Sequence, residues 1–502
     1  ASLVMCPTRG GKVARFDAAA AQKLPGVKHV LEVAPYHGGT GGVAVIADTP
    51  WHAKKAAAAV TVEWDHGPAA TLSSDTVMAR LAQALDEAKG FGYHSAGDVD
   101  AAMQGAATTI TADYRAPYLA HAALEPINCT VQFKDGAATV WTSTQVPGLA
   151  RRAAAKALDI DDEKVTVHQL LLGGGFGRRL EADYVAQAAA IAKVAGGAPV
   201  QTLWSREQDT QHDFYRPACM ARFKAGFDAQ GQLVAWHNVS VGQAIVPQVL
   251  VRTFGLAGAG PDKTTSEGAF DQPYEWPHAR IAHEIVDLPL PVGFWRSVGH
   301  SHQAFFKESF VDEAAHAAGA DPLAFREGLL QRHPRQLAVL RAAAKASGWG
   351  TPSPAAPDGA KTARGIALHE SFGSIVAQVA EVSLGADQAI RVHRVWCAID
   401  CGTAVNPAGI RQQMEGGVIF GLSAALHGGV DIVDGQVQQS NFHDQPLLRL
   451  NEAPAIETVI VPSIEHPEGV GEPGVPPIAP AVANALFALT GQRLRSLPLK
   501  PA

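Results

Sequence analysis

The sequence has few of the residues that build metal centres or disulfide frameworks. Zinc and iron–sulfur sites need closely spaced cysteine and histidine ligands, and this chain contains no C-x-x-C pair. So few cysteines in so long a chain also argue against a disulfide scaffold. The five cysteines are widely scattered over the 502 residues: Cys6, Cys129, Cys219, Cys397 and Cys401.

Long apolar runs and an excess of basic charge are absent as well. No stretch reaches the roughly 18 uninterrupted apolar residues that a membrane-spanning helix needs, and the most apolar segment, 416–430, is broken by glycines, Ser423 and His427. The net charge is −7 without a long basic run, which argues against nucleic acid or a membrane surface as a partner. No serine lies in a G-x-S-x-G elbow, so an α/β-hydrolase is not indicated.

The composition is that of a large globular protein with several domains. Hydrophobic residues make up 47% and charged residues 18%, with 49 glycines and 32 prolines. Short apolar runs alternate with alanine-rich stretches, which predicts an α+β (mixed α/β) fold. We interpret the polar stretch 67–97 as a linker and the Pro/Gly/Ala-rich stretch 349–361 as an internal boundary. The predicted domains are therefore 1–97, 98–348 and 349–502.

A glycine-rich loop follows the apolar run 165–172. Its sequence is GGGFGRR (173–179), and the 3.6-residue spacing of apolar side chains in 182–192 predicts a helix directly after it. Glycines leave backbone N–H groups bare for an anionic group, and Arg178 and Arg179 add charge-assisted donors suited to phosphate. A glycine-rich connector with a solvated arginine pair explains the same pattern, so the residues alone leave both interpretations open.

Two further side chains are candidates for chemistry. Glu472 lies in a rigid Gly/Pro loop between Gly471 and Pro473, where a carboxylate facing a cleft suits general-base work. Gln145 falls at a predicted strand-to-helix junction, from which its amide can point into a cleft. Taken alone, each is more commonly an ordinary surface residue. The three pairs His121/Glu125, His212/Asp213 and His369/Glu370 lack zinc spacing, and we interpret their histidines as structural.

Several separated motifs occur in a recognisable order along the chain: Trp141–Gln145, then GGGFGRR, GFWRSVGH (293–300), DCGTAVNPAGIRQQMEGG (400–417) and GVGEP (469–473). In this order the sequence resembles the xanthine oxidase family of molybdenum hydroxylases. WSREQDTQHDFYRP and ALHESFGSIVAQVAEVS are similar to the large subunits of the isoquinoline 1-oxidoreductase and membrane-bound aldehyde dehydrogenase type. The resemblance covers nearly the whole chain.

This resemblance implies a hammerhead-like α/β domain followed by two large molybdopterin-binding α+β domains. It implies a catalytic subunit that oxidises an aldehyde to a carboxylic acid, or hydroxylates an N-heterocycle beside the ring nitrogen, with oxygen derived from water. Glu472 matches the family's catalytic base, and the molybdenum is held by the pterin dithiolene rather than by protein ligands. The residues matched to cofactor binding are Gln145, Gly174, Gly175, Phe176, Gly177, Arg178, Arg296 and Gln413.

The implied cofactor is molybdopterin cytosine dinucleotide with molybdenum, and the implied electron acceptor is a small partner subunit with two [2Fe–2S] clusters. A cytochrome c subunit and a periplasmic, membrane-associated location follow from the same branch, with a cytoplasmic location left open. Two departures stand out. The Gly-Gln-Gly pterin contact is missing, so we expect it on a separate chain, in a cleaved N-terminal piece or in a segment outside this sequence. Leu180 stands where purine-oxidising relatives carry a substrate-binding glutamate.

Two other functions remain to be separated from this one. The first treats 165–204 as a Rossmann unit of a nucleotide-dependent oxidoreductase, although GGGFGRR departs from the G-x-G-x-x-G spacing. The second is a non-catalytic scaffold subunit of the same fold, against which the retained Glu472 and Gln145 argue.

Overall fold

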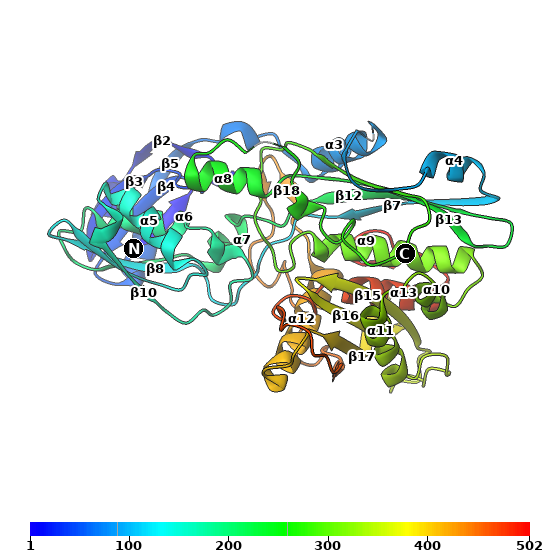
Figure 1. The fold of residues 1–502 in the computed structure, drawn as a ribbon. Coiled ribbons are helices and arrows are strands. Elements are labelled where there is room, and N and C mark those ends of the chain that lie inside the picture. Colours follow the sequence, from blue (N-terminus) through cyan, green and yellow to red (C-terminus); the bar gives the residue numbers. More distant parts are fainter. Residues whose placement is uncertain (88, 259, 502) are drawn as a thin grey trace.

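The structure is a computed structural model that describes residues 1–87, 89–258 and 260–501. The chain forms an N-terminal lobe, a central body built on a long sheet and a C-terminal body, and the chain crosses between them several times (Figure 1). The predicted mixed α/β class is confirmed. Within the described residues, no helix combines the length and the apolar character that crossing a membrane requires.

The N-terminal lobe combines two parts of the chain, 1–66 and 128–211. Leu3 and Met5 share one apolar core with Val131, Val140 and Val185, so the lobe closes only when both parts are present. Its sheets have the strand orders β1-β4-β3, β2-β5 and β10-β9-β8-β11. The elements are β1 Ser2–Met5, β2 Lys12–Asp17, α1 Ala19–Gln22, β3 Val27–Val33, β4 Gly42–Ala47, α2 Pro50–Ala57, β5 Thr61–Asp65, β8 Asn128–Lys134, β9 Ala137–Thr142, α5 Pro147–Leu158, β10 Val165–Gln169, α6 Asp183–Ala192, β11 Val200–Leu203 and α7 Arg206–Gln211.

The topology of this lobe excludes the Rossmann interpretation of 165–204. A Rossmann unit is built on an all-parallel sheet, in which the crossover helix joins parallel strands. Here β10 and β11 are opposite edges of a mixed sheet with β9 and β8 between them, and β8 runs antiparallel to both of its neighbours. Helix α6 is alanine-rich and almost entirely buried, because it packs between α5 and β8.

The central body is a five-stranded sheet of order β6-β14-β13-β12-β7. Helix α9 crosses beneath it and is buried along nearly its whole length, since it also contacts β15 and α13 of the C-terminal body. One continuous core therefore joins Tyr114 and Phe223 of the sheet, Phe310 of α9 and Val379 of the C-terminal body. The elements are α3 Ser74–Glu87, β6 Phe91–Ala96, α4 Val99–Gln104, β7 Thr108–Ala116, β12 Cys219–Phe227, β13 Leu233–Gly242, α8 Val246–Phe254, β14 Ala279–Ile285, α9 His300–Ala317 and α10 Pro322–Gly328.

The structure corrects the interpretation of 67–97 as a linker. Helix α3 buries Val77, Leu81 and Leu85, a stripe at i, i+4 and i+8, against β12 and β13. Strand β6 then pairs with β14 as the edge strand of the five-stranded sheet. Because the apolar stripe is only one residue wide, the polar residues around it made the segment resemble a linker.

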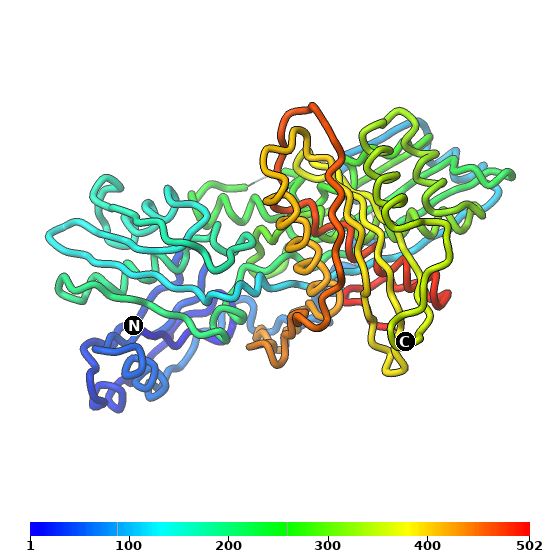
Figure 2. The backbone as a smooth tube through the Cα atoms, turned by 90° about the horizontal axis from the view of Figure 1, so that it is seen from below, coloured from blue at the N-terminus to red at the C-terminus, as the bar shows by residue number. Residues whose placement is uncertain are grey.

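The C-terminal body is a four-stranded sheet of order β15-β16-β17-β20. The proposed boundary at 349–361 does connect α11 to β15, yet α11 packs on β16 and β17, so the core is continuous across it. Both views place α12 between the N-terminal lobe and these strands (Figures 1 and 2). The elements are α11 Pro334–Ser347, β15 Ala363–Ser371, β16 Ser374–Leu384, β17 Ile390–Asp400, α12 Pro407–His427, β18 Ile432–Val433, β19 Gln436–Val437, β20 Ala455–Ile460 and α13 Ile478–Thr490. Short 3-10 turns occur at Gly67–Ala69, Asp162–Lys164, Arg178–Leu180 and Lys263–Thr265.

Candidate active site

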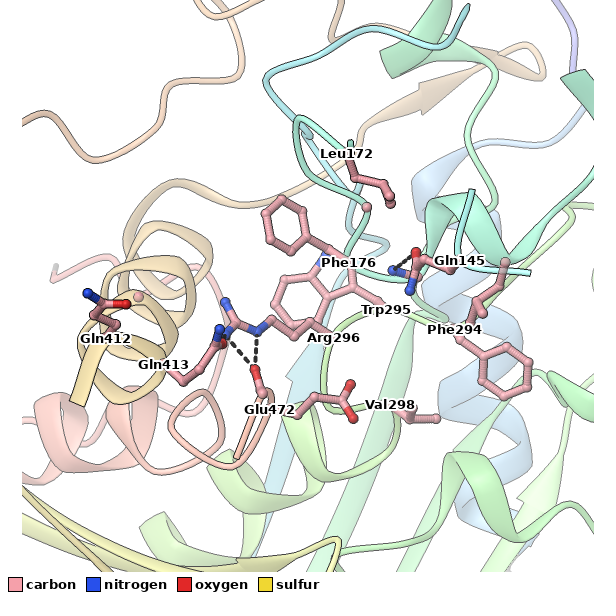
Figure 3. Close-up of a pocket in the computed structure, with 15 residues that line it drawn as sticks. Gln145, Leu172, Phe176, Phe294, Trp295, Arg296, Val298, Gln412, Gln413 and Glu472 are labelled. Atoms are coloured by element: carbon pink, nitrogen blue, oxygen red, sulfur yellow. Dashed lines mark hydrogen bonds between the residues drawn. The ribbon is translucent and has the colours of Figure 1, made fainter. Parts of the chain in front are cut away.

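A cavity of about 730 Å³ lies where the glycine-rich loop meets two other loops and the first half of α12. Figure 3 shows that side chains from all of these segments converge on it. The motifs come from distant parts of the sequence, and the fold gathers them around one space. The lining residues are Gln145, Leu172, Gly175, Phe176, Gly177, Leu180, Phe294, Trp295, Arg296, Val298, Gln412, Gln413, Gly416, Gly471 and Glu472.

The glycine-rich loop lines this cavity in a backbone conformation that side chains at its glycine positions would disturb. Gly174 and Gly177 have φ values of 103° and 110°, and Phe176 between them has φ 56°. A Cβ at Gly177 would lie 1.6 Å from the carbonyl oxygen of Phe294. At Gly175 it would lie 2.7 Å from Oε1 of Gln145. Glycine is therefore required at Gly177 for the loop to pack this closely, whereas a side chain at Gly175 would push the Gln145 amide from its place.

Gln145 is fixed to the glycine-rich loop at two points. Its backbone N–H donates to the carbonyl of Arg179 at 3.0 Å. Its side-chain Oε1 accepts the Gly177 N–H at 3.1 Å (Figure 3). With the amide oxygen engaged, the NH₂ group is the part of Gln145 that remains to donate into the cavity.

Arg296 joins α12 to the loop that carries Glu472. Its Nε donates to the carbonyl of Gly471 at 2.8 Å, and one of its terminal nitrogens donates to Oε1 of Gln413 at 3.2 Å (Figure 3). The guanidinium also lies over the rings of Phe176 and Phe420, 5.8 and 5.4 Å from their centroids. Burial lowers the pKa of Arg296, and the nearby Glu472 carboxylate opposes that effect.

Glu472 is half-buried and lines the same cavity. The backbone N–H of Ser297 donates to its Oε1 at 3.0 Å, and the Ser297 hydroxyl donates to its carbonyl oxygen at 2.8 Å. Figure 3 places its carboxylate close to Val298. Its loop is fixed further along by Gln378, whose amide donates to the carbonyl of Gly474 at 2.8 Å.

Arg178 departs from its predicted role toward phosphate. Its side chain is buried and forms a two-point ion pair with Asp183, at 2.9 and 3.0 Å, and its Nε lies 3.3 Å from Asp213. It also stacks over Phe214, 5.2 Å from the ring centroid. Burial alone would lower the pKa of Arg178, but the charges of Asp183 and Asp213 raise it. Because the guanidinium is committed to these carboxylates and does not line the cavity, its role is to support the loop from behind.

Arg179 is a supporting residue that the sequence analysis treated only as an anion donor. It is fully buried and donates to the carbonyl of Gly174 at 2.9 Å, to Oγ of Ser143 at 2.8 Å and to Oε2 of Glu125 at 3.0 Å. Glu125 also accepts the Gly173 N–H at 2.8 Å. Burial raises the pKa of Glu125, but hydrogen bonds from Asn128 and Gly173 and the charge of Arg179 outweigh it and hold the pKa below its usual value.

His121 connects the buried carboxylate of Asp213, which lies behind the glycine-rich loop, to the loop that carries Phe294. Its Nδ1 lies 2.9 Å from Asp213, and its Nε2 lies 2.7 Å from the carbonyl of Phe294. The same Asp213 also faces Arg178, so one buried carboxylate is shared by both loops. Burial raises the pKa of Asp213, but His121 and Arg178 outweigh it and lower the pKa overall. The structural role assigned to His121 from the sequence agrees with these contacts.

Comparison with known proteins decides the family. Two family models described as molybdopterin cofactor-binding domains match residues 82–328 and 321–454. The chain is 33% identical to the beta chain of isoquinoline 1-oxidoreductase from Brevundimonas diminuta, over 99% of this chain and 64% of the relative. It is 31% identical to the membrane-bound aldehyde dehydrogenase [pyrroloquinoline-quinone] of Gluconacetobacter polyoxogenes, over 99% of this chain and 67% of the relative. The chain belongs to the xanthine oxidase family of molybdopterin-binding subunits.

Solved structures agree on the fold. Quinoline 2-oxidoreductase from Pseudomonas putida 86 superposes with a TM-score of 0.78 at 15% identity, covering 99% of this chain and 93% of that chain. Aldehyde oxidoreductase from Desulfovibrio gigas gives a TM-score of 0.76 at 15% identity, covering 99% of this chain and 76% of that chain. The chain spans about two thirds of the length of the two curated relatives named above.

The residues around the cavity fit the family's cofactor. Gly175 and Gly177 line the cavity without a side chain, which leaves room for a planar ring system beside the loop. Gln145 and Gln413 line the same space, and because their amide oxygens accept hydrogen bonds from Gly177 and Arg296, their NH₂ groups are the donors left for a ligand. An adjoining cavity of about 840 Å³ shares Phe176, Trp295 and Arg296 with the first and provides room beyond it. Among the described residues, no group of three or more His, Cys, Asp or Glu side chains is arranged to hold a metal ion.

Proposed function

We propose that this chain is the catalytic subunit of a molybdenum hydroxylase. The reaction is the oxidation of an aldehyde to a carboxylic acid, or hydroxylation of an N-heterocycle beside its ring nitrogen, with oxygen derived from water. The single observation that carries the proposal is that the Glu472 carboxylate lines the same cavity as the glycine-rich loop and Gln145. The relatives described as isoquinoline 1-oxidoreductase and membrane-bound aldehyde dehydrogenase support the two substrate classes.

The proposed cofactor-binding set is smaller than the one expected from the sequence. Gly175, Phe176 and Gly177, which line the cavity, would hold the pterin together with the adjacent Gly174, and Gln145, Arg296 and Gln413 would donate to it. Arg178 is left out because of its ion pairs. The bound molybdenum cofactor would supply the two-electron redox chemistry that amino-acid side chains lack. Cytosine dinucleotide is the form that we propose, and the adjoining cavity offers space for it.

Glu472 would act as the general base. Ser297 holds one carboxylate oxygen, Oε1, so the carboxylate is oriented while the other oxygen stays available to accept a proton. Pro473 directly follows it, which restricts the loop backbone. Glu472 would accept the proton released when the water-derived oxygen is transferred to the substrate carbon, and would hold it at Oε2, the oxygen that Ser297 does not engage.

The walls of the cavity favour a neutral, largely apolar substrate. Leu172, Leu180, Phe294 and Val298 line it, and their side chains offer no hydrogen bond to a charged substrate group. Leu180 in particular cannot make the contact that the glutamate of purine-oxidising relatives makes. Aromatic aldehydes and unsubstituted N-heterocycles are therefore better candidates than xanthine.

The proposed partners complete the electron path. We propose a small subunit with two [2Fe–2S] clusters, a cytochrome c subunit and a further segment or chain that carries the Gly-Gln-Gly contact. Two relatives, one of isoquinoline 1-oxidoreductase and one of nicotinate dehydrogenase, are themselves described as single subunits of their enzymes, which supports an assembly of several chains. A periplasmic location, with membrane association through these partners, belongs to the same proposal.

The test is a metal and activity measurement on the purified complex. We expect about one molybdenum and one pterin per chain, and turnover of benzaldehyde or quinoline with an artificial electron acceptor. Glu472→Gln should lower kcat by about 10²- to 10⁴-fold while metal content and Tm are retained. Glu468→Gln, an exposed glutamate in the same loop, is the matched control and should keep wild-type kcat.

Two results would contradict the proposal. A complex without molybdenum that still turns over would exclude the hydroxylase. A complex with molybdenum in which Glu472→Gln equals wild type would exclude Glu472 as the base. The scaffold alternative predicts no turnover by wild type at all.

A further inference from the structure

The turn that precedes α9 has an unusual backbone. Ser297 has φ 74° and Val298 has φ 46°, both in the left-handed region that disfavours side chains. The second of these is β-branched, which makes the conformation rarer still. Such a backbone costs free energy and persists only where the surrounding structure holds it.

The surroundings hold this turn firmly. The Val298 N–H donates to the carbonyl of Trp295 at 2.6 Å, and the Ser301 hydroxyl donates to the carbonyl of Val298 at 2.7 Å. Gly299 next to it packs so closely on Glu267 that a Cβ there would lie 3.0 Å from its Cγ. The turn is thus fixed from both sides, and Ser297 is completely buried.

What the strained conformation gains is a double contact with Glu472. The Ser297 N–H reaches Oε1 of the carboxylate at 3.0 Å, and the hydroxyl of the same residue reaches the Glu472 carbonyl at 2.8 Å. Because φ sets the direction of the N–H relative to the side chain, one residue makes both contacts only in a narrow range of backbone angles. Arg296 adds a third donor, to the carbonyl of Gly471.

We propose that Ser297 is the residue that positions the base. Its hydroxyl holds the backbone carbonyl of Glu472, and this keeps the Glu472 carboxylate within hydrogen-bond distance of the Ser297 N–H. This inference rests on the proposed role of Glu472. Ser297 itself does not line the cavity, so it would not touch a substrate bound there. Its effect is on the orientation of the carboxylate, so it should appear in kcat rather than in KM.

The experiment compares three variants of the holoenzyme complex. Ser297→Ala and Ser297→Gly both remove the hydroxyl, but glycine also accepts the left-handed φ without strain. Ser374→Ala is the matched control, because the Ser374 hydroxyl donates at 2.8 Å to the carbonyl of Gly469 in the same loop, away from the carboxylate. The measurements are kcat, KM, molybdenum content and Tm.

We expect kcat to fall about tenfold in both Ser297 variants, because each loses one hydrogen bond that orients Glu472. KM and molybdenum content should stay unchanged. Tm should stay at or above the wild-type value in Ser297→Gly, so activity and stability separate. Ser374→Ala should do the reverse and lower Tm while keeping kcat.

The inference is overturned if kcat follows Tm across all three variants, if glycine restores the kcat that alanine loses, or if both Ser297 variants keep wild-type kcat. Failure of the proposed function has a different signature. It would appear in the wild-type complex and in Glu472→Gln before any Ser297 variant is made.

Discussion

The two walls of the cavity are held in different ways. Behind the glycine-rich loop lie ion pairs of two buried arginines, in which Arg178 faces the buried Asp183 and Asp213 while Arg179 faces the half-buried Glu125. The wall that carries Glu472 is held by hydrogen bonds to backbone carbonyls and by the strained turn at Ser297. Removing one partner of a buried ion pair leaves a charge uncompensated, whereas losing one neutral hydrogen bond costs much less. The first wall should therefore be sensitive in stability, and the second in activity.

The largest effect should follow from closing the glycine-rich wall itself. Gly177→Ala would place a Cβ 1.6 Å from the carbonyl of Phe294, at a φ of 110°. We expect the loop to be displaced and molybdenum incorporation to be lost. Gly136→Ala is the control, because φ there is 75° but nothing lies within 4 Å of the added Cβ. Metal content that is equal in both variants would show that the loop does not hold the cofactor.

The next largest effect tests whether buried charge fixes this wall. Arg179→Met should lower the free energy of unfolding by about 3–5 kcal/mol, because the buried guanidinium makes several hydrogen bonds, to Gly174, Ser143 and Glu125, and all of them are lost. Denaturant unfolding measures it. Arg391→Met removes an exposed pair with Asp387 and should cost at most about 1 kcal/mol. Similar losses in the two variants would remove the distinction between the walls.

The third effect lies behind the Glu472 wall and depends on pH. Burial, together with the charge of Asp271, raises the pKa of Glu267 to about 8 from its usual 4.5. Between these pH values the folded protein keeps a proton that the unfolded chain releases, so stability falls as the pH rises. Glutamine does not titrate, so Glu267→Gln does not lose stability in this way. The Tm of Glu267→Gln relative to the Tm of wild type should therefore rise between about pH 5.5 and about pH 8.5.

Thermal melts at both pH values test this prediction, with the exposed Glu457→Gln as control. A Tm difference between Glu267→Gln and wild type that stays the same at the two pH values would mean that Glu267 is ionised throughout. In that case burial would not raise the pKa of Glu267 into this pH range.

The sequence predicted the mixed fold class and the family, because ordered motifs survive in the chain at low overall similarity. It also predicted that Gln145, Arg296, Gln413 and Glu472 belong to one site, and the structure brings them around one cavity. Their individual roles stay predictions. Because the proximity of these residues depends on long-range packing, local sequence patterns could not predict it. The prediction came from the family resemblance.

The remaining differences have identifiable physical causes. Arg178 and Arg179 are adjacent and identical in type, and only the fold reveals which buried carboxylates pair with each of them. The segment of helix α3 was interpreted as part of a linker because its buried stripe of Val77, Leu81 and Leu85 is narrow. Ser297 carries no sequence signal at all, since its function depends on a backbone angle.

The division of the N-terminal lobe between 1–66 and 128–211 has a consequence for biosynthesis. Residues 1–66 are translated before residues 128–211, which supply the strands that cover their core, and the intervening segment belongs to another body. The central and C-terminal bodies also depend on residues translated much later, because the backbone N–H of Leu497 donates to the carbonyl of Arg115 and that of Leu499 to the carbonyl of Ala425. Contacts this distant close slowly and leave apolar surface exposed meanwhile. Nascent chains of this protein should therefore depend on chaperones, and a cofactor can be inserted only after translation has passed the Glu472 loop.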